Sequence, residues 1–533
     1  MKIYKLLGIV ALSAGLFSTT SCTGDLDVTP IDPNLDVPVN VLKNAQAYEQ
    51  ILAKCYSAFA VSSPDGKDGG PDIDGIDGGF GQYIRALYNL QELTTDEAVV
   101  GWNDQTIKNL HWLNWTSTDV FVTACYSRIF YSISLCNEVI RQIDNNTLAE
   151  SEQAKLQQYK AEARCLRALC YYHAIDLFGN VPFVTEKMGI GDIPDQIKRA
   201  DLFKWLTEEE IPAFADKLPA SPDKYRAGQG LAYTILAKLY LNAEVYTGTA
   251  MYDKCAEACA KVLSLGYKLE SATLWPDLFN ATNSKLQGPG HEIIFSIYQD
   301  ETYCQGYGGT TFLLWCTVGG DMLYGEYGMA SSGWGGMRVT PEYADLYSNN
   351  DLRGNVLVKE DKGQQKEIDD LGNFQNGYAF PKFTNLTDQN LDGNLSALNT
   401  TYSFNSADFP VFRAADIYLM LAECQVIGGV NVDINGKDGI ALFNEVHTRM
   451  GAGLIPNPTR RQIIDERGRE LGWECHRRSD LVRFNMLTTN EYAWAWKGKT
   501  KEGNISVDAK YNLFPIPSSD LISNTKLQPN TGY

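Results

Sequence analysis

Basic residues are scarce in this 533-residue sequence, and they do not gather in any one stretch. It has 46 Lys and Arg residues against 65 Asp and Glu residues, which gives a formal net charge of −19. Because nucleic-acid phosphates are bound by clustered Lys and Arg side chains, this composition argues against a nucleic-acid partner. The acidity is chiefly a matter of solubility.

The sequence also lacks the common spacings of metal ligands and paired cysteines. Its five His residues are scattered without an HExxH pattern, and its twelve Cys residues form no CxxC pair. Several cysteines instead fall on the apolar faces of predicted helices, where a thiol packs as a small apolar group; these are Cys165, Cys170, Cys255, Cys259 and Cys424. We therefore predict no zinc site, no disulfide framework and no cofactor.

Long apolar runs are missing beyond the N-terminus, where residues 1–21 have the pattern of a signal peptide. Lys2 and Lys5 precede the apolar run Leu6–Phe17, which is too short to span a bilayer. Small residues then lead to Cys22, which is similar to a bacterial lipobox with Thr19 in the place of the usual Leu. We predict acylation of Cys22, with a plain secretory signal as the alternative, followed by an acidic, Pro-rich tether over residues 22–40.

Helical periodicity is the main structural signal in the rest of the chain. Over residues 231–269, apolar side chains recur at spacings of three and four, and Gly248 and Gly266 follow the two periodic stretches. This predicts a helical hairpin of the tetratricopeptide type, a unit of about 34 residues that needs stacked neighbours to bury its apolar faces. The predicted fold is mainly α, a tetratricopeptide-like helical-repeat scaffold with little β structure.

We predict that residues 41–533 form a single domain with one long interruption. Helical repeats are expected over about 41–270 and 410–485, and a loop-rich excursion over about 274–400, in which only Glu292–Ile297 has the pattern of a strand. A second Gly- and Asp-rich stretch, residues 62–81, is predicted to be a loop. Its carboxylates could suit calcium, but the EF-hand spacing is missing, so a plain or ligand-facing loop is the preferred interpretation.

Four segments together resemble the SusD/RagB family of outer-membrane nutrient-binding lipoproteins. They are Ala161–Leu169 running into Leu177–Phe183, Arg413–Glu423, Glu466–Phe484 and Phe514–Pro517. The charged residues within them, such as Arg413, Arg467 and Glu470, are interpreted as buried structural ion pairs rather than catalytic groups.

Three further segments are similar to starch-binding members of that family: Asn242–Gly248, Tyr307–Thr311 and Arg477–Gly498. The resemblance implies non-catalytic binding of starch or maltooligosaccharides, an α-glucan ligand, at the extracellular face of the outer membrane, with a lipid anchor. It also implies delivery of that ligand to a SusC-like TonB-dependent transporter.

Flat aromatic side chains in glycine-rich loops are the candidate ligand-binding residues. Sugar rings expose apolar C–H faces and a rim of hydroxyls, so a site for them needs rings for stacking and a few polar groups for orientation. Trp102, Tyr307 and Trp334 are each flanked by glycines, which we expect to leave the ring faces open.

The resemblance implies that these three rings form an aromatic arc and that Asp77, Arg85 and Gln105 bind hydroxyls. Gln105 stands where the family pattern has Asn, and Val100 replaces an aromatic residue, so the Trp102 side is expected to differ in detail. Trp494 and Trp496, in the C-terminal segment, are expected to pack in the interior.

Three other functions remain open from the sequence. A glycoside hydrolase would need two carboxylates about 5–10 Å apart across the scissile bond. A helical-repeat adaptor would bind only protein, and the same family role could serve a different glycan.

Overall fold

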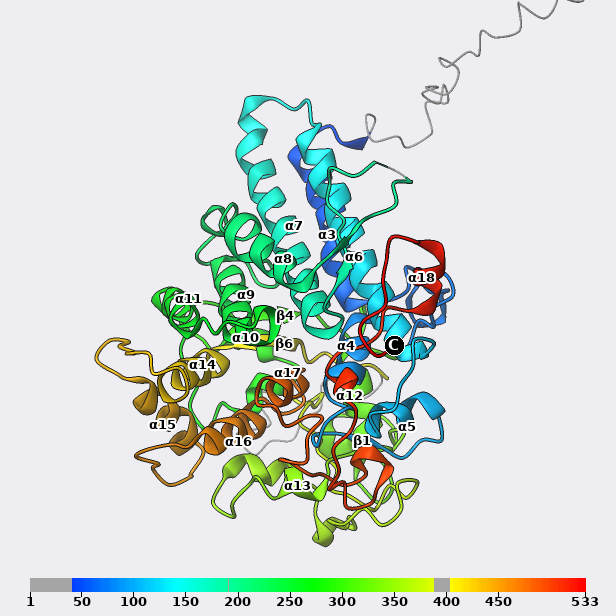
Figure 1. Ribbon diagram of the computed structural model, residues 1–533, viewed down its shortest axis with the longest axis vertical. Coiled ribbons are helices and arrows are strands. Elements are labelled where there is room, and N and C mark those ends of the chain that lie inside the picture. Colours follow the sequence, from blue (N-terminus) through cyan, green and yellow to red (C-terminus); the bar gives the residue numbers. More distant parts are fainter. Residues whose placement is uncertain (1–40, 190, 388–402) are drawn as a thin grey trace, which may run out of the picture.

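The computed structural model describes residues 41–189, 191–387 and 403–533 (Figure 1). The predicted signal peptide, the tether and Cys22 lie outside these ranges, as do residues 388–400 of the predicted excursion. The described chain is mainly helical, as predicted, and its strands are few and short. Within these ranges, no helix combines the length and apolarity needed to cross a bilayer.

Three long helices lie side by side at one end of the molecule: α3 (Ala45–Ala60), α6 (Val120–Asp144) and α7 (Glu150–Leu177) (Figure 1). Asn44 caps α3 by accepting a hydrogen bond from the Ala47 N–H at 2.9 Å. Asp119 caps α6 in the same way. Helix α7 begins at Glu150 with no side-chain cap. The carboxylates of Glu150 and Glu152 lie in its first turn, where they stabilise the positive end of the helix dipole.

The predicted helical hairpin is confirmed as α9 (Gln229–Leu241) and α11 (Tyr252–Ser264). A short helix that was not predicted, α10 (Ala243–Thr247), lies between them and ends at Gly248. Gly248 has φ of 80° and Gly266 has φ of 97°, so both adopt the left-handed conformation that glycine tolerates best.

Residues 199–217 do not form one continuous helix. The chain forms α8 (Arg199–Lys204), a π-helical turn (Trp205–Glu210) and a short 3-10 turn (Ala215–Lys217). Pro212 has no N–H to continue the helical ladder, so a regular α-helix cannot pass through it.

The C-terminal half adds a second group of helices. Its members are α14 (Ala414–Val426), α15 (Gly439–Arg449), α16 (Arg460–Leu471), α17 (Arg477–Arg483) and α18 (Ser518–Ser523). Thr459 and Gln462 form a reciprocal capping box at the start of α16.

The charged residues of this half form buried ion pairs, as expected. Arg413 Nε lies 2.7 Å from Glu474 Oε2 and Arg413 Nη1 lies 3.0 Å from Glu470 Oε1, and all three side chains are at most 1% exposed. Arg483 Nε lies 2.6 Å from Glu423 Oε1. Because both partners of each pair are buried, removing one would leave a charge without compensation, so these residues have a structural role.

The short strands pair residues that are far apart in the sequence. The predicted strand is confirmed as β4 (Ile293–Ile297), which pairs antiparallel with β6 (Phe409–Arg413). Two further antiparallel pairs join β1 (Val99–Val100) to β5 (Met337–Arg338) and β2 (Val181–Pro182) to β3 (Gln196–Ile197).

The excursion contains helices that the sequence pattern did not indicate. These are α12 (Gly309–Thr317) and α13 (Pro341–Ala344). Nearly every residue of α12 is buried, so its sequence has no polar face to create a helical period. It packs against α4 (Tyr83–Gln91), and β1 leads on toward α5 (Gln105–His111), so this part of the excursion lies beside N-terminal helices (Figure 1).

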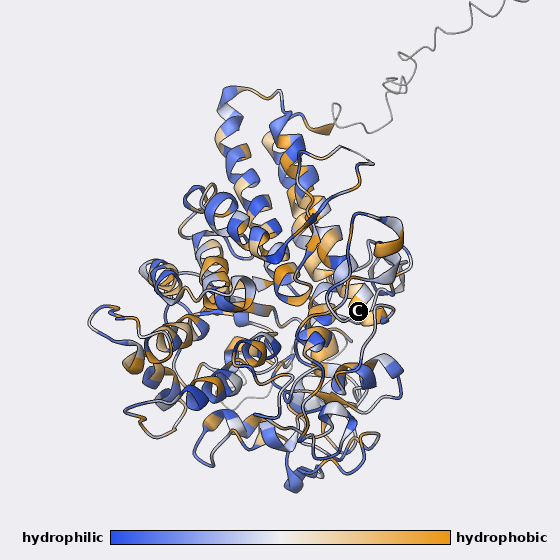
Figure 2. Ribbon diagram, in the orientation of Figure 1, coloured by the Kyte–Doolittle hydropathy of each residue, from blue (hydrophilic) through white to orange (hydrophobic). Residues whose placement is uncertain are grey.

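One large cluster of buried apolar side chains runs from α3 through the long helices to the C-terminal segment. Figure 2 shows hydrophobic colour where helices meet and hydrophilic colour along the outer loops. The predicted core cysteines, Cys165, Cys170, Cys255, Cys259 and Cys424, are all buried. The interior is therefore shared between the helical scaffold and the excursion, and the loops described next rest on it.

Candidate functional site

A two-residue β ladder brings Trp102 and Trp334 together. In the pairing of β1 with β5, Val99 lies opposite Arg338 and Val100 opposite Met337. Because the strands are antiparallel, the residues that follow β1 run beside the residues that precede β5. The Trp102 indole N–H donates to the Gly335 carbonyl at 3.2 Å, although the two residues are 233 positions apart in the sequence.

Helix α12 connects the third ring, Tyr307, to the same place. Tyr307 comes just before the start of α12, and the other end of α12 fixes the loop that carries Trp334. The Trp334 N–H donates to the Trp315 carbonyl at 2.6 Å, and the Gly335 N–H donates to the Val318 carbonyl at 3.1 Å.

Tyr307, Trp334 and Trp102 form a continuous row of rings, called here the aromatic arc. The ring centroids of Tyr307 and Trp334 are 6.0 Å apart with an interplanar angle of 58°, and those of Trp334 and Trp102 are 6.3 Å apart with an angle of 60°. Tyr307 is 43% exposed and Trp334 is 37% exposed, while Trp102 is half-buried. Each ring is therefore strongly tilted against its neighbour, and the three rings do not form one flat surface.

Arg85 and Asp77 lie at the Tyr307 end of the aromatic arc. The Arg85 guanidinium donates to the Tyr307 carbonyl at 2.7 Å. A Cβ atom added to Gly79 would lie 3.1 Å from Asp77 Oδ1, 3.3 Å from Arg85 Nη1 and 3.9 Å from Tyr307 Cβ, so these three side chains converge on one point. The same Asp77 oxygen accepts the N–H groups of Gly79, at 2.8 Å, and Phe80, at 3.1 Å.

Arg85 remains a cation in this position. Burial lowers the pKa of its guanidinium to about 10, whereas the nearby Cys316, Asp77 and Asp104 act in the opposite direction. Its guanidinium carbon lies 4.2 Å from the centroid of the Phe312 ring, which belongs to α12. A guanidinium held in this way offers fixed donors to hydroxyl groups.

Gln105 is placed less closely than the other predicted polar residues. It is the first residue of α5, it is exposed, and its amide donates to Asn109 Oδ1 of the same helix at 2.8 Å. It follows Trp102 by three positions, so it stands at the opposite end of the aromatic arc from Arg85.

The expectation that glycines leave the ring faces open is wrong for most of them. A Cβ on Gly336 would lie 2.5 Å from Trp102 Nε1, one on Gly333 would lie 2.4 Å from the Val318 carbonyl oxygen, and one on Gly308 would lie 2.4 Å from Gln82 Cβ. These glycines allow backbone and side chains to approach closely. Gly306 alone of the flanking glycines faces open space.

Sequence reasoning missed Gln82, a buried residue whose side chain holds the segments of Arg85 and Gly309 together. Its side-chain oxygen accepts the N–H groups of Arg85, at 3.0 Å, and Gly309, at 2.8 Å, so one amide joins the start of α4 to the start of α12. Its contact with Arg85 is a local helix cap, but no sequence signal shows the link to Gly309, which lies 227 positions away along the chain.

Other aromatic residues surround the aromatic arc or lie away from it. The Trp315 ring centroid is 5.9 Å from that of Trp334, and the Phe404 centroid is 5.9 Å from that of Tyr307. Trp494 is fully buried, as expected, and Trp496 is half-buried with its N–H donating to the Ile368 carbonyl at 3.1 Å.

The Gly- and Asp-rich loop of residues 62–81 is held by an arginine. Arg128 Nη1 and Nη2 lie 2.8 and 2.6 Å from the two carboxylate oxygens of Asp72, and Arg128 Nε donates to the Gly81 carbonyl at 2.7 Å. Within the described ranges, no three or more His, Cys, Asp or Glu side chains are grouped so that they could hold a metal ion.

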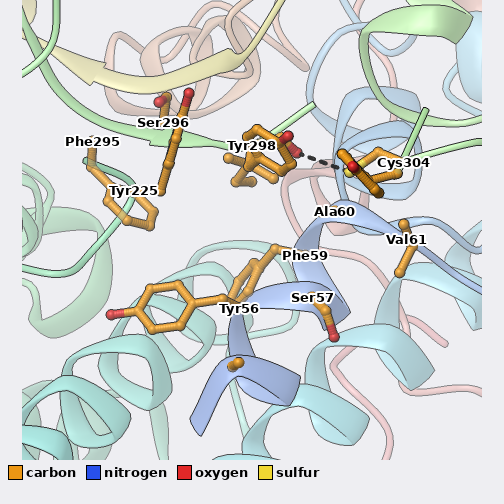
Figure 3. Close-up of a pocket in the computed structure, with 13 residues that line it drawn as sticks. Tyr56, Ser57, Phe59, Ala60, Val61, Tyr225, Phe295, Ser296, Tyr298 and Cys304 are labelled. Atoms are coloured by element: carbon orange, nitrogen blue, oxygen red, sulfur yellow. Dashed lines mark hydrogen bonds between the residues drawn. The ribbon is translucent and has the colours of Figure 1, made fainter. Parts of the chain in front are cut away.

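A large cavity of about 510 Å³ lies elsewhere, between α3 and β4 (Figure 3). Tyr56, Phe59, Tyr225 and Tyr298 line it, and the described lining residues include no charged side chain. The Tyr56 hydroxyl is already donated to Glu162 Oε2 at 2.7 Å. This cavity therefore has rings but lacks charged groups such as Arg85 and Asp77, which lie at the aromatic arc.

Comparisons with known proteins agree on one family. Residues 362–533 match the family model described as "SusD family", and residues 83–241 match the one described as "Starch-binding associating with outer membrane". The chain is 32% identical to the starch-binding protein SusD of Bacteroides thetaiotaomicron, over 98% of this chain and 97% of that protein. It is also 27% identical to the SusD-like protein P25 of Formosa agariphila, over 76% of this chain and 78% of that protein.

Solved structures share the fold. A laminarin-binding SusD-like protein has a TM-score of 0.68 and 22% identity, and the match covers 92% of this chain and 100% of that one. The surface glycan-binding protein A of Bacteroides thetaiotaomicron, in complex with laminarihexaose, has a TM-score of 0.68 and 20% identity, covering 91% of this chain and 99% of that one.

Proposed function

This chain belongs to the SusD family of glycan-binding proteins, and we propose that it binds starch-derived maltooligosaccharides at the aromatic arc without cleaving them. The bent row formed by Tyr307, Trp334 and Trp102 is the observation that carries this proposal. An α-glucan is a helically curved chain, so successive sugar rings can each lie against one ring of a bent aromatic surface. Arg85 and Asp77 provide donors and acceptors for hydroxyls at one end.

The choice of starch among glycans rests on two supports. The protein that is 32% identical over nearly the whole length is a starch-binding protein, and the curvature of the aromatic arc suits an α-linked chain better than an extended one. A different glycan in the same family role is the alternative, and the experiment below includes it.

We propose a role in binding rather than hydrolysis, and the contacts of Asp77 support it. A glycosidase needs one carboxylic acid that gives up a proton and a second carboxylate across the bond. Asp77 Oδ1 already accepts two backbone N–H groups, and this carboxylate lies beside the Arg85 guanidinium. Such a group is suited to accept hydrogen bonds from hydroxyls. We expect no release of reducing sugar from amylose, and no change in affinity when EDTA removes metal ions.

The proposed cellular setting follows from the N-terminal sequence and the family. We propose that Cys22 is acylated, that the protein is held at the extracellular face of the outer membrane, and that it passes its ligand to a SusC-like TonB-dependent transporter. The lipobox-like sequence before Cys22 and the description of the matched family as associating with the outer membrane support this setting.

Calorimetric titration with maltoheptaose tests the proposal. We expect the soluble chain that starts after Cys22 to bind it. We expect Trp334→Ala to lose at least about 2 kcal/mol of binding free energy, or roughly 30-fold in affinity, because a central aromatic ring that the ligand covers contributes on this scale. Tyr307→Ala is expected to weaken binding as well. Tyr303→Ala is the matched control, since Tyr303 lies on the same loop, is 79% exposed and lines the apolar cavity instead.

Three results would contradict parts of this proposal. If the wild type binds laminarihexaose and ignores maltoheptaose, the glycan is wrong. If Trp334→Ala and Tyr307→Ala bind as well as the Tyr303→Ala control, the aromatic arc is not the site. Reducing sugar released by the pure protein would show an enzyme.

A further inference from the structure

A second cavity, of about 400 Å³, adjoins the aromatic arc at Trp102. This volume lies within the range of about 300–1,000 Å³ that is typical of small-ligand pockets. It is lined by the end of β1, the first part of α5 and residues 370–372 of the excursion. Trp102 belongs both to the aromatic arc and to this cavity.

The lining of this cavity combines an apolar floor with a polar rim. Val100 and Ile107 are buried, while Asn103 and Asp370 are exposed and Lys108 is half-buried. The Lys108 ammonium donates to the Asn103 side-chain oxygen. An indole ring, an ammonium, an amide and a carboxylate around one space are the combination that a hydroxyl-bearing ring needs, namely an apolar face to stack on and both donors and acceptors at its edge.

The part of the lining formed by residues 370–372 is fixed by a buried arginine. Arg338, in β5, donates through Nη2 to the Leu371 carbonyl at 2.8 Å and through Nε to the Asn376 carbonyl at 2.7 Å. Gly101 makes room for this approach, since a Cβ there would lie 2.7 Å from the Leu371 oxygen and 2.8 Å from Arg338 Nη1. Asp370 Oδ1 accepts the Gly372 N–H at 2.9 Å, which uses one of its two carboxylate oxygens and orients the side chain.

We propose that this cavity, called here the Trp102 cavity, is an additional glycan subsite that takes a sugar ring beyond those stacked on the aromatic arc. The proposal rests on the proposed function. A chain that follows the bend from Tyr307 to Trp334 and on to Trp102 reaches the mouth of this space. There Asp370 accepts hydrogen bonds from its hydroxyls and Lys108 donates to them. The apolar cavity between α3 and β4 does not suit this role, because it offers no charged partner.

The consequence is a dependence of affinity on glycan length. A short ligand is held by the aromatic arc alone, whereas a longer one also reaches the Trp102 cavity. Changes to the polar rim of the cavity should therefore weaken the binding of long ligands and spare short ones.

Calorimetry with maltotriose and maltoheptaose tests this on two rim variants, Asp370→Asn and Lys108→Met. Asp370→Asn keeps the shape and an acceptor for the Gly372 N–H but removes the charge, and charge-assisted hydrogen bonds are about twice as strong as neutral ones. We expect each variant to lower maltoheptaose affinity by about three- to tenfold and to change maltotriose affinity by less than about twofold.

Asp369→Asn is the matched control for the carboxylate. Asp369 precedes Asp370, but its side chain is 68% exposed and its Oδ1 lies 2.6 Å from Lys501 Nζ, outside the lining of the cavity. We expect it to leave both affinities unchanged while removing the same charge from the same segment.

Each outcome separates this proposal from the one on which it rests. If Asp370→Asn and Lys108→Met weaken both ligands equally, or neither ligand, the Trp102 cavity is not a subsite although the aromatic arc still binds glucan. If the wild type binds neither maltotriose nor maltoheptaose, the proposed function itself fails, and the subsite fails with it.

Discussion

Replacing Gln82 by methionine tests whether the aromatic arc is positioned by a single buried amide. Gln82 is 3% exposed, and all its polar atoms are engaged. Its oxygen accepts the N–H groups of Arg85 and Gly309, and its NH₂ group donates to the carbonyls of Phe59, at 2.7 Å, and Ala60, at 3.1 Å. Methionine has a similar length and fills the same space, but it cannot make these four hydrogen bonds.

The magnitude follows from the groups that lose their partner. The Ala60 carbonyl keeps a second, longer hydrogen bond from Gln299, at 3.4 Å, so its loss is partly offset. The other three backbone groups lose the Gln82 hydrogen bond, and leaving a buried group unsatisfied costs about 1–3 kcal/mol. Part of this cost is recovered because methionine has no polar atoms to desolvate. We expect Gln82→Met to lower the free energy of unfolding by about 3 kcal/mol in urea denaturation.

Binding should weaken too, because Gln82 joins the two segments that carry Arg85 and Tyr307. Without it, the guanidinium bond to the Tyr307 carbonyl would have to hold this end of the aromatic arc alone. We expect a loss of about tenfold in maltoheptaose affinity, measured without urea and at a temperature where the variant is fully folded. The reason is that a fixed geometry spares the ligand the cost of ordering the site.

Gln91→Met is the matched control. Gln91 is the last residue of α4, the helix that Gln82 caps, and it is 2% exposed. It donates to Asp176 Oδ2, at 3.1 Å, and to Ser479 Oγ, at 3.2 Å, away from the aromatic arc. We expect this variant to lose stability and keep its affinity. If Gln82→Met loses stability to the same extent as Gln91→Met and binds maltoheptaose as tightly as the wild type, Gln82 does not position the site.

Two further substitutions probe the packing of Trp102 and a buried carboxyl pair. In Gly336→Ala the new Cβ would meet Trp102 Nε1 at 2.5 Å, so we expect the ring to shift and maltoheptaose affinity to fall by about tenfold. Gly325→Ala, whose Cβ would meet no atom within 4 Å, should bind normally in the same titration. For Glu92, burial raises the pKa from 4.5 to about 8. Between pH 4.5 and about 8, the native state therefore holds a proton that the unfolded chain has lost. Stability must fall as the pH rises through this range. Glu92→Gln copies the protonated form beside Glu97. In urea unfolding it should match the wild type at pH 5 and exceed it at pH 8, and equal stabilities at both values would contradict the assignment.

The parts of the fold that could be predicted are those with local signals. Helix α3 begins after an Asn cap and has an apolar face, and Gly248 and Gly266 follow the helices of the hairpin. Helix α12 could not be predicted in this way. It is buried on every side, so the polar residues that would mark a helical period are missing from its sequence.

The candidate site divides along the same line. Its aromatic residues could be named from their glycine-rich setting together with the family resemblance, but the reason for the glycines was predicted wrongly. Gly336 serves the close approach of Trp102, and that approach exists only because β1 pairs with β5. A pairing of two residues in each strand, more than two hundred positions apart, leaves no periodic pattern in the sequence.

The way in which the rings are held bears on how the protein binds. Each ring of the aromatic arc belongs to a loop whose backbone is tied by a hydrogen bond to another segment. The Gly101 N–H donates to the Gly336 carbonyl at 3.0 Å, the Trp334 N–H donates to the Trp315 carbonyl, and the Arg85 guanidinium donates to the Tyr307 carbonyl. The two ends of α12 thus set the distance between Tyr307 and Trp334, and the β1–β5 ladder sets that between Trp334 and Trp102. Since these ties do not involve the ligand, the bend of the surface exists before binding, and little conformational entropy is lost when a glycan arrives. We therefore expect the preformed tilt of the rings to favour a curved glycan over an extended one, because successive units of a curved chain can each face one ring.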